Sequence, residues 1–326
     1  MNYRTKAMFY RQLGAMLTSG LDLVRALKQF TTGAYTQLRP PAQALYNAIV
    51  AGVPLAEAMQ SLSSRTFSPL EISVVHAGEQ SGNLAESVTR LATYFEFLER
   101  TRSRLLGGMV YPIVLFHAAI IIPAVPALVL QGPGRFLSLV IPPFLVVYGC
   151  LFGFLAVRRT IGASSPLTAA WDEMVVRIPV FGKLARTTAL VRFIQSFTCL
   201  LSAGVGAAEA VRIAAGTLGN AAMEREMLQA VPRLQKGTSL VESFAGNRFI
   251  TPVLADMLAT GEESGRLEES LERVAGYLQQ EADATVERIV TILPVLVYLA
   301  VAAYIGYIVI SFYGSYINQV NSLMNE

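Results

Sequence analysis

The sequence predicts an all-α integral membrane protein, built from two repeated cytoplasmic bundles of helices and three transmembrane helices. The first supporting observation is compositional: the 326 residues are 53% hydrophobic and only 15% charged, whereas soluble domains carry about a quarter charged residues. The second is the presence of three long runs without Asp, Glu, Lys or Arg. The third is a short element rich in glycine and glutamate that occurs once in each half of the chain.

The few cysteines and histidines exclude several kinds of site. Cys150 and Cys199 are the only cysteines, and His76 and His117 are the only histidines. Two cysteines cannot build a disulfide framework or a zinc site, and two histidines make a histidine-dependent catalytic triad a poor candidate. The net charge of +3 is too small to indicate direct binding of nucleic acid. No cofactor is expected.

Three apolar runs, residues 109–131, 136–157 and 289–313, reach the roughly 20 residues that a helix needs to cross a bilayer. None of them contains a charged residue, which favours membrane helices over buried helices of a soluble protein. The segment Gly132–Arg135 holds two glycines and a proline, which predicts a tight turn. Residues 109–157 are therefore expected to form a transmembrane hairpin.

The arginines that flank these runs predict the orientation in the membrane. Six of them lie beside the ends assigned to the cytoplasm: Arg100, Arg102, Arg104, Arg158, Arg159 and Arg288. The other side has only Arg135, and no Lys or Arg follows Tyr313. Basic residues collect on the cytoplasmic side of membrane proteins. Residues 1–108 and 158–288 are thus expected to be the two cytoplasmic bundles, and the tail 314–326 is expected outside.

The two cytoplasmic segments resemble each other. The first contains Gly78, Glu79, Ser81 and Gly82, which match Gly261, Glu262, Ser264 and Gly265 of the second. An apolar stripe at helical spacing follows each element: Leu84, Val88, Leu91 and Phe95 in the first copy, and Leu267, Leu271, Val274 and Leu278 in the second. Each element is expected to be a turn between two helices, where Gly82 or Gly265 takes a positive φ.

No enzymatic site emerges from the repeated element. Ser81 and Ser264 do not sit in a nucleophile elbow of the form Gly-x-Ser-x-Gly. In the repeated element, Gly-x-x-Ser-Gly, the serine comes one position too late, and no strand precedes it. Both serines are expected to be turn or capping residues. The sequence Gly182-Lys183 is followed by Leu184, so a nucleotide-binding loop is also missing. Any mechanical work must then be driven by a partner.

Three glutamates of the element, Glu79, Glu262 and Glu263, are candidate ligands of a hard cation such as calcium. The alternative is that they are solvated charges at helix ends, and we favour this interpretation. In the first predicted membrane helix, His117 is a functional candidate because ionisable residues are rare there, although a neutral histidine bonded between helices is the favoured interpretation. Gly149 and Gly153 form a small-residue pair that suits close helix packing, within one chain or between chains.

The paired element of the form Gly-Glu-(Glu/Gln)-Ser-Gly, each copy followed by an amphipathic helix and an apolar run, resembles the F-protein family of type II secretion systems. That family includes the PilC-like inner-membrane platform proteins of type IV pili. The resemblance implies two cytoplasmic six-helix bundles, homo-oligomers, and contact with a cytoplasmic assembly ATPase. The first copy departs from the second, with Gln80 and Asn83 in place of Glu263 and Arg266. Many members also have an additional cytoplasmic stretch before the first bundle.

The resulting expectation is a platform protein of the bacterial inner membrane, not an enzyme, with a cytoplasmic N-terminus and a periplasmic C-terminus. It would couple the assembly ATPase to the assembly of pilins or pseudopilins, together with other inner-membrane proteins. A small transporter would need more spans or charged intramembrane groups, and a prepilin-processing enzyme would need intramembrane aspartates, which none of the three runs contains. The residues leave open whether the machine makes pili, secretes proteins or imports DNA, and how many copies assemble.

Overall fold

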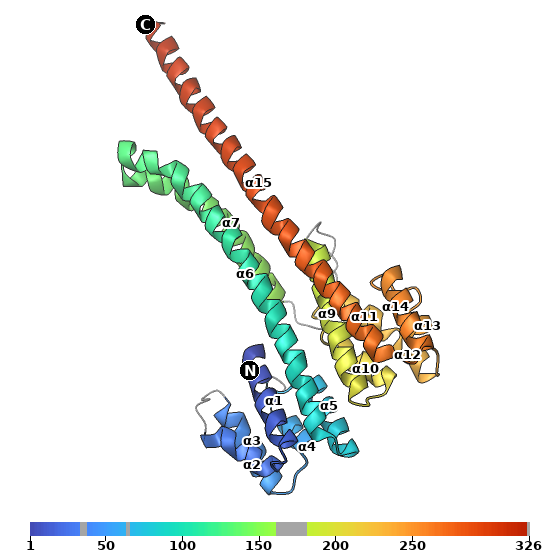
Figure 1. Ribbon diagram of the computed structural model, residues 1–326. Coiled ribbons are helices and arrows are strands. Elements are labelled where there is room, and N and C mark those ends of the chain that lie inside the picture. The colour runs from blue at the N-terminus through green and yellow to red at the C-terminus, as the bar shows by residue number, and fades with distance from the viewer. Residues whose placement is uncertain (33–37, 63–65, 161–180, 325–326) are drawn as a thin grey trace. The chain divides into compact units, whose positions relative to one another are not determined.

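The computed structural model describes residues 1–32, 38–62, 66–160 and 181–324, and Figure 1 labels their helices. All regular elements among these residues are helices, which confirms the all-α prediction for the described part of the chain. The chain divides into two compact units, Met1–Arg104 with Ala169–Ala282, and Leu105–Thr168 with Asp283–Glu326. The two longest helices, α6 and α15, each contribute to both units.

The first unit begins with five helices that lead into α6. They are α1 (Tyr3–Thr18), α2 (Leu23–Thr32), α3 (Arg39–Val50), α4 (Leu55–Ser61) and α5 (Pro69–Ser81), followed by α6 (Leu84–Gln131). Local chemistry sets several of their ends. The side chain of Asn2 accepts a hydrogen bond from the backbone of Thr5 and caps α1. Ser68 and Glu71 form a capping box at the start of α5, which has Pro69 in its first turn.

The second half of the chain repeats this order with one difference. It contains α9 (Phe181–Ser202), α10 (Ala207–Ala215), α11 (Ala221–Leu228), α12 (Val231–Gln235), α13 (Leu240–Ser243), α14 (Pro252–Glu263) and α15 (Leu267–Met324). Two short helices, α11 and α12, stand where the first half has the single helix α3. Pro232 lies in the first turn of α12, where its missing N–H is tolerated, and it would interrupt a continuous helix.

Buried apolar residues from both halves form one hydrophobic cluster in this unit. The stripe predicted on the last helix of each half faces it: Val88, Leu91 and Phe95 are buried, and so are Leu271, Val274 and Leu278. Leu84 and Leu267, at the start of the two stripes, are half-buried and pack against the cluster. The amphipathic pattern therefore marks the core-facing side of α6 and α15 correctly.

The second unit contains the end of α6, the helix α7 (Pro133–Thr160) and the end of α15. Gly132, with φ of +86°, is the single residue between α6 and α7, so the turn is shorter than the four residues predicted. By length and composition, one helix of the described chain, Leu84–Val129, is able to cross a membrane, and Pro133–Gly149 is a shorter apolar helix. Most side chains of the third apolar run, and residues 161–180 of the predicted second bundle, lie outside the described residues.

Candidate functional site

The two glutamates of the repeated element, Glu79 and Glu262, bind the N-termini of short helices. In the first half, Glu79 accepts hydrogen bonds from the backbone N–H groups of Leu55 at 2.6 Å and Ala56 at 3.0 Å, at the start of α4. In the second half, Glu262 accepts bonds from Leu240 at 2.7 Å and Val241 at 3.2 Å, at the start of α13. The first N–H groups of a helix lack partners within the helix, so each carboxylate supplies the missing acceptors.

The glycines that precede these glutamates allow two helices to touch. A Cβ atom on Gly78 would collide with the side chain of Ser87 in α6, and a Cβ atom on Gly261 would collide with Ser270 in α15. Only glycine lets the backbones approach this closely. Each element therefore joins a helix to the first turns of the helix that follows it.

The serine and second glycine of each element complete the turn. Ser81 donates its hydroxyl hydrogen bond to the carbonyl of Ala77 at 2.9 Å, and Ser264 donates to Thr260 at 2.6 Å. Gly82 and Gly265 follow with φ of +73° and +68°, in the left-handed region that favours glycine. Both serine hydroxyls bond back to their own helix: Ser81 is the last residue of α5, and Ser264 directly follows α14.

The geometry gives the element a structural role in both halves. Glu79 and Glu262 are half-buried and accept hydrogen bonds from backbone N–H groups, so they are not the solvated charges that we favoured from the sequence. Glu263 is exposed. No group of three or more His, Cys, Asp or Glu side chains within the described residues is arranged to hold a metal ion. The calcium hypothesis for Glu79, Glu262 and Glu263 remains a prediction, and two of its three carboxylates already have backbone partners.

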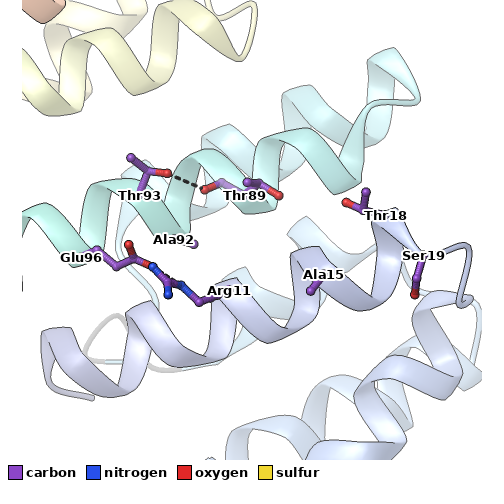
Figure 2. Close-up of a pocket in the computed structure, with 8 residues that line it drawn as sticks. All are labelled: Arg11, Ala15, Thr18, Ser19, Thr89, Ala92, Thr93 and Glu96. Carbon is purple, nitrogen blue, oxygen red and sulfur yellow. Dashed lines mark hydrogen bonds and ion pairs between the residues drawn. The ribbon is translucent and has the colours of Figure 1, made fainter.

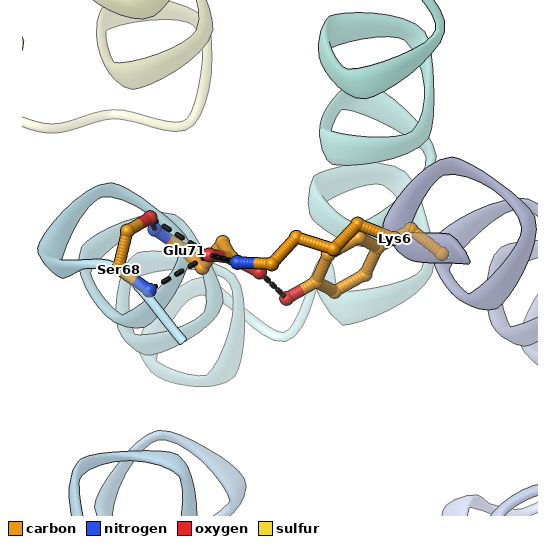
Figure 3. Close-up of polar contacts among 4 residues, drawn as sticks. Lys6, Ser68 and Glu71 are labelled. Carbon is orange, nitrogen blue, oxygen red and sulfur yellow. Dashed lines mark hydrogen bonds and ion pairs between the residues drawn. The ribbon is translucent and has the colours of Figure 1, made fainter. Parts of the chain in front are cut away.

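A buried ion pair joins α1 to α5 in the first half. The ammonium of Lys6 in α1 contacts the carboxylate of Glu71 in α5, and both side chains are buried. Figure 3 shows Lys6 reaching Glu71 next to Ser68. Ser68 donates to the same carboxylate through its backbone N–H and its hydroxyl, each at 2.7 Å, and the hydroxyl of Tyr10 donates at 2.6 Å. Burial, followed by the charge of Glu71, raises the pKa of Tyr10.

The second half replaces this polar network with apolar residues. Alignment of Phe9 with Phe193 and of Gly82 with Gly265 places Leu190, Ile194 and Leu254 at the positions of Lys6, Tyr10 and Glu71. All three are buried in the core. Sequence reasoning missed the network, although the spacing of Ser68 and Glu71 before an apolar run is a readable capping-box signal.

An open groove runs between α1 and α6 in the first half. Its volume is about 580 Å³, and Figure 2 shows its lining: Arg11, Ala15, Thr18, Ser19, Thr89, Ala92, Thr93 and Glu96. The guanidinium of Arg11 forms an ion pair with Glu96 across it, and this contact raises the pKa of Arg11. A second hollow continues along the same two helices and adds Arg4, Met8, Glu99 and Arg100.

Helix α6 also contacts α9 and α15 of the second half. Tyr94 of α6 is buried there, with its hydroxyl 3.1 Å from that of Ser196 in α9. Thr101 of α6 donates to the side-chain oxygen of Gln279 in α15 at 3.0 Å. Burial raises the pKa of Tyr94. Contacts of α6 with both of these helices thus join the two halves.

Comparison with known proteins explains why the halves match. The family model described as type II secretion system protein F matches residues 9–131 and 193–314, so it covers a segment of each half. This chain belongs to the type II secretion system protein F family. The predicted family is confirmed, and each matched segment contains one copy of the glycine–glutamate element.

Curated relatives of this F-family chain come from both pilus and secretion systems. The chain is 30% identical to the type IV pilus assembly protein PilC of Thermus thermophilus, over 93% of this chain and 79% of the relative. It is 28% identical to the type II secretion system protein F of Aeromonas hydrophila, over 98% of this chain and 87% of the relative. It is 26% identical to PilC of Pseudomonas aeruginosa, over 94% and 87%.

The residues singled out in the apolar hairpin of this F-family chain lie in α6 and α7. The ring of His117 bridges the two helices, with Nδ1 2.7 Å from the carbonyl oxygen of Ile113 and Nε2 2.8 Å from the hydroxyl of Tyr148. Because a carbonyl only accepts, Nδ1 is the donor in the contact with Ile113. A Cβ atom on Gly149 or Gly153 would meet nothing within 4 Å, so no close packing at these glycines occurs among the described residues.

Proposed function

We propose that this protein is an inner-membrane platform of a type IV pilus or type II secretion machine. The observation that carries the proposal is the match of the family model to both halves of the chain. Relatives named as PilC and as secretion protein F cover nearly the whole sequence. Their names support pilus assembly and protein secretion equally, so the proposal does not choose between the two outputs.

The proposed topology places both helical segments, residues 1–108 and 158–288, in the cytoplasm. Three helices, 109–131, 136–157 and 289–313, would cross the bilayer, and the tail 314–326 would be periplasmic. The absence of charged residues from the three runs supports this arrangement, as does the gathering of arginines at their cytoplasmic ends. Each cytoplasmic segment would be a bundle of six helices, counting α11 and α12 as one broken helix.

The platform would transmit work that it does not generate. The sequence contains no nucleotide-binding loop, so a separate cytoplasmic ATPase would supply the energy. The cytoplasmic bundles would contact that ATPase, and the membrane helices would hold pilins or pseudopilins and other inner-membrane assembly proteins. The repeated element stabilises the bundles through which force would pass, and no catalytic residue is proposed.

Two experiments test this function. Deletion of the gene should abolish filaments or secretion in the host, and the full-length chain should restore them. Antibody against the assembly ATPase should detect that protein with the tagged chain after mild detergent extraction, but not with an unrelated membrane protein carrying the same tag. Normal filaments and normal secretion in the deletion strain would reject the proposal.

Topology is tested by labelling single cysteines in whole cells. In a chain with Cys150→Ala and Cys199→Ala, a membrane-impermeant maleimide should modify Ser322→Cys in the proposed tail but not Lys236→Cys in the exposed turn after α12. Lysis should make the second position reactive. Labelling of Lys236→Cys in intact cells would overturn the proposed orientation.

A further inference from the structure

The second hollow between α1 and α6 carries charged side chains that have no partner among the described residues. Its volume is about 410 Å³, which lies in the range of pockets that hold small ligands. Two of its charged residues neutralise each other, because the guanidinium of Arg11 forms an ion pair with Glu96 (Figure 2). The other lining residues are Arg4, Ala7, Met8, Glu99 and Arg100.

Three charged side chains of this hollow, those of Arg4, Glu99 and Arg100, remain unpaired. Both arginines are exposed, and no described acidic group lies within ion-pairing distance of either. Glu99 is half-buried, and its Oε2 atom is buried without a hydrogen-bond partner in the described part of the chain. A buried acceptor without a hydrogen bond destabilises a protein. A ligand that brings both a cationic donor and an anionic group would satisfy all three side chains.

The second half of the chain lacks this combination of charges. The alignment of the two halves places Thr188, Ala282 and Asp283 at the positions of Arg4, Glu99 and Arg100. One arginine is thus replaced by a neutral residue, the other by an acid, and the glutamate by an alanine that is buried. The charges of the hollow are therefore not a requirement of the repeated fold.

Under the proposed platform function and its topology, on which this site depends, the hollow lies close to the lipid-facing part of α6. Residues 105–131 contain no charged side chain, and Leu106 is already 58% exposed. Leu106 follows Arg100 by six residues, or about 9 Å along the helix. Lipid head groups occupy about 5–7 Å outside the hydrocarbon core, and a long arginine side chain spans the remaining distance.

We propose that this hollow binds the head group of a phospholipid that carries a phosphoethanolamine. Arg4 and Arg100 would hold the phosphate, because guanidinium groups bind phosphate oxygens through several N–H donors at once. The carboxylate of Glu99 would accept hydrogen bonds from the ammonium group. The bound lipid would then link α1 to α6 beside the membrane.

Glu99 is the residue that would select this head group. Phosphoglycerol brings a phosphate and neutral hydroxyl donors, which form weaker hydrogen bonds to a carboxylate than an ammonium group does. Phosphocholine brings a cation whose methyl groups replace every N–H donor, so it cannot supply the hydrogen bond that the buried oxygen lacks. Phosphoethanolamine should therefore bind more tightly than either.

Native mass spectrometry of the delipidated full-length chain in detergent measures this order. Dioleoyl phosphatidylethanolamine should bind roughly tenfold more tightly than dioleoyl phosphatidylcholine or dioleoyl phosphatidylglycerol, as expected for one charge-assisted hydrogen bond. Equal affinities for the three lipids would overturn the proposal. Soluble glycerophosphoethanolamine is the second probe, and it should bind more weakly than the lipid. If it binds as tightly, the assignment to a membrane lipid is wrong.

Substitutions separate the roles of the charges. Glu99→Gln should lower the affinity for phosphatidylethanolamine roughly tenfold and leave that for phosphatidylcholine nearly unchanged. Arg4→Gln combined with Arg100→Gln should weaken the binding of all three lipids roughly tenfold or more, since all three carry the phosphate. Glu57→Gln on α4 and Arg225→Gln on α11, both exposed, are the matched controls and should bind lipid like the parent. A Glu99→Gln variant that keeps the preference for phosphatidylethanolamine would contradict the proposed site.

Lipid binding is measured on the purified chain, so its outcome is independent of filaments, secretion and orientation in the membrane. Retained lipid selectivity in a chain that is dispensable for filaments and secretion would support this site and reject the platform function. Thermal unfolding of each variant in detergent should match that of the parent. Arg4 and Arg100 are exposed, and Glu99→Gln keeps the shape of the side chain.

Discussion

Glu79 and Glu262 occupy matching places in the two halves, and each holds two backbone N–H groups at the start of a short helix. Their helices also touch the next helix through matching glycines, Gly78 and Gly261. Each copy of the repeated element is therefore a joint between three consecutive helices. The element appears twice because each half needs the same joint.

Removal of one of these carboxylates should lower the free energy of unfolding of the protein. Glu262→Ala leaves the N–H groups of Leu240 and Val241 without their acceptor, at a cost of about 1–3 kcal/mol. Glu263→Ala is the matched control: this neighbour is exposed, so a change within about 0.5 kcal/mol is expected. Thermal unfolding in detergent measures both. Equal effects of the two substitutions would contradict the capping role.

The glycine of the joint should not tolerate a methyl group. Gly78→Ala drives a Cβ atom into Ser87, and overpacking of this kind costs about 1–3 kcal/mol. Ser87→Gly in the same chain should restore much of the loss by making room. Gly276→Ala is the control, since a Cβ atom there meets nothing within 4 Å; it should stabilise the protein by about 0.5–1 kcal/mol. A Gly78→Ala variant as stable as this control would exclude the close contact.

Replacing Lys6, Tyr10 and Glu71 together by apolar residues should preserve the stability of the protein, whereas replacing Glu71 alone should not. Glu71→Leu leaves the ammonium of Lys6 buried and unpaired, which typically costs about 3–5 kcal/mol. The triple variant Lys6→Leu, Tyr10→Ile, Glu71→Leu installs the apolar residues of the second half and should be close to the parent in stability. Denaturant unfolding of the two variants gives the comparison. A triple variant as unstable as Glu71→Leu would show that the two cores are not interchangeable.

Alkaline pH should unfold the protein partly through Cys199. Burial raises the pKa of this thiol from 9.0 to about 12, so the folded thiol keeps its proton where the unfolded thiol loses it. Stability then falls as pH rises from about 9 to about 12, by at most about 1.4 kcal/mol per pH unit. Cys199→Ala, the residue found in the other half, should make the dependence shallower in this window. Tyr10 and Tyr94, whose pKa values are also raised by burial, should sustain a decline above pH 10 in both proteins.

Local sequence patterns predicted the buried helix faces and the helix ends, because residues close together in the chain determine both. The stripe through Val88 and Leu91 indicates a buried helix face, and the turn glycine Gly82 indicates where α5 ends, because both signals lie within one or two turns of helix. The turn around Gly132 was expected for similar reasons, although the structure closes it with one residue. The family followed from the same local elements, since their two copies occur before apolar runs.

The remaining features depend on contacts between distant residues. Glu79 reaches a helix that begins 24 residues earlier, and Lys6 meets Glu71 across 65 residues, so no spacing in the sequence indicates either contact. The interpretation of Glu79 and Glu262 as solvated charges was wrong for this reason. The groove between α1 and α6 is also invisible in the sequence, since it depends on how the first and last helices of the first half pack against each other.

The contact of α6 with α9 and α15 has a consequence for how the two halves assemble. A single chain carries both partners of that contact, so their effective concentration is fixed by the covalent link and the contact forms at any expression level.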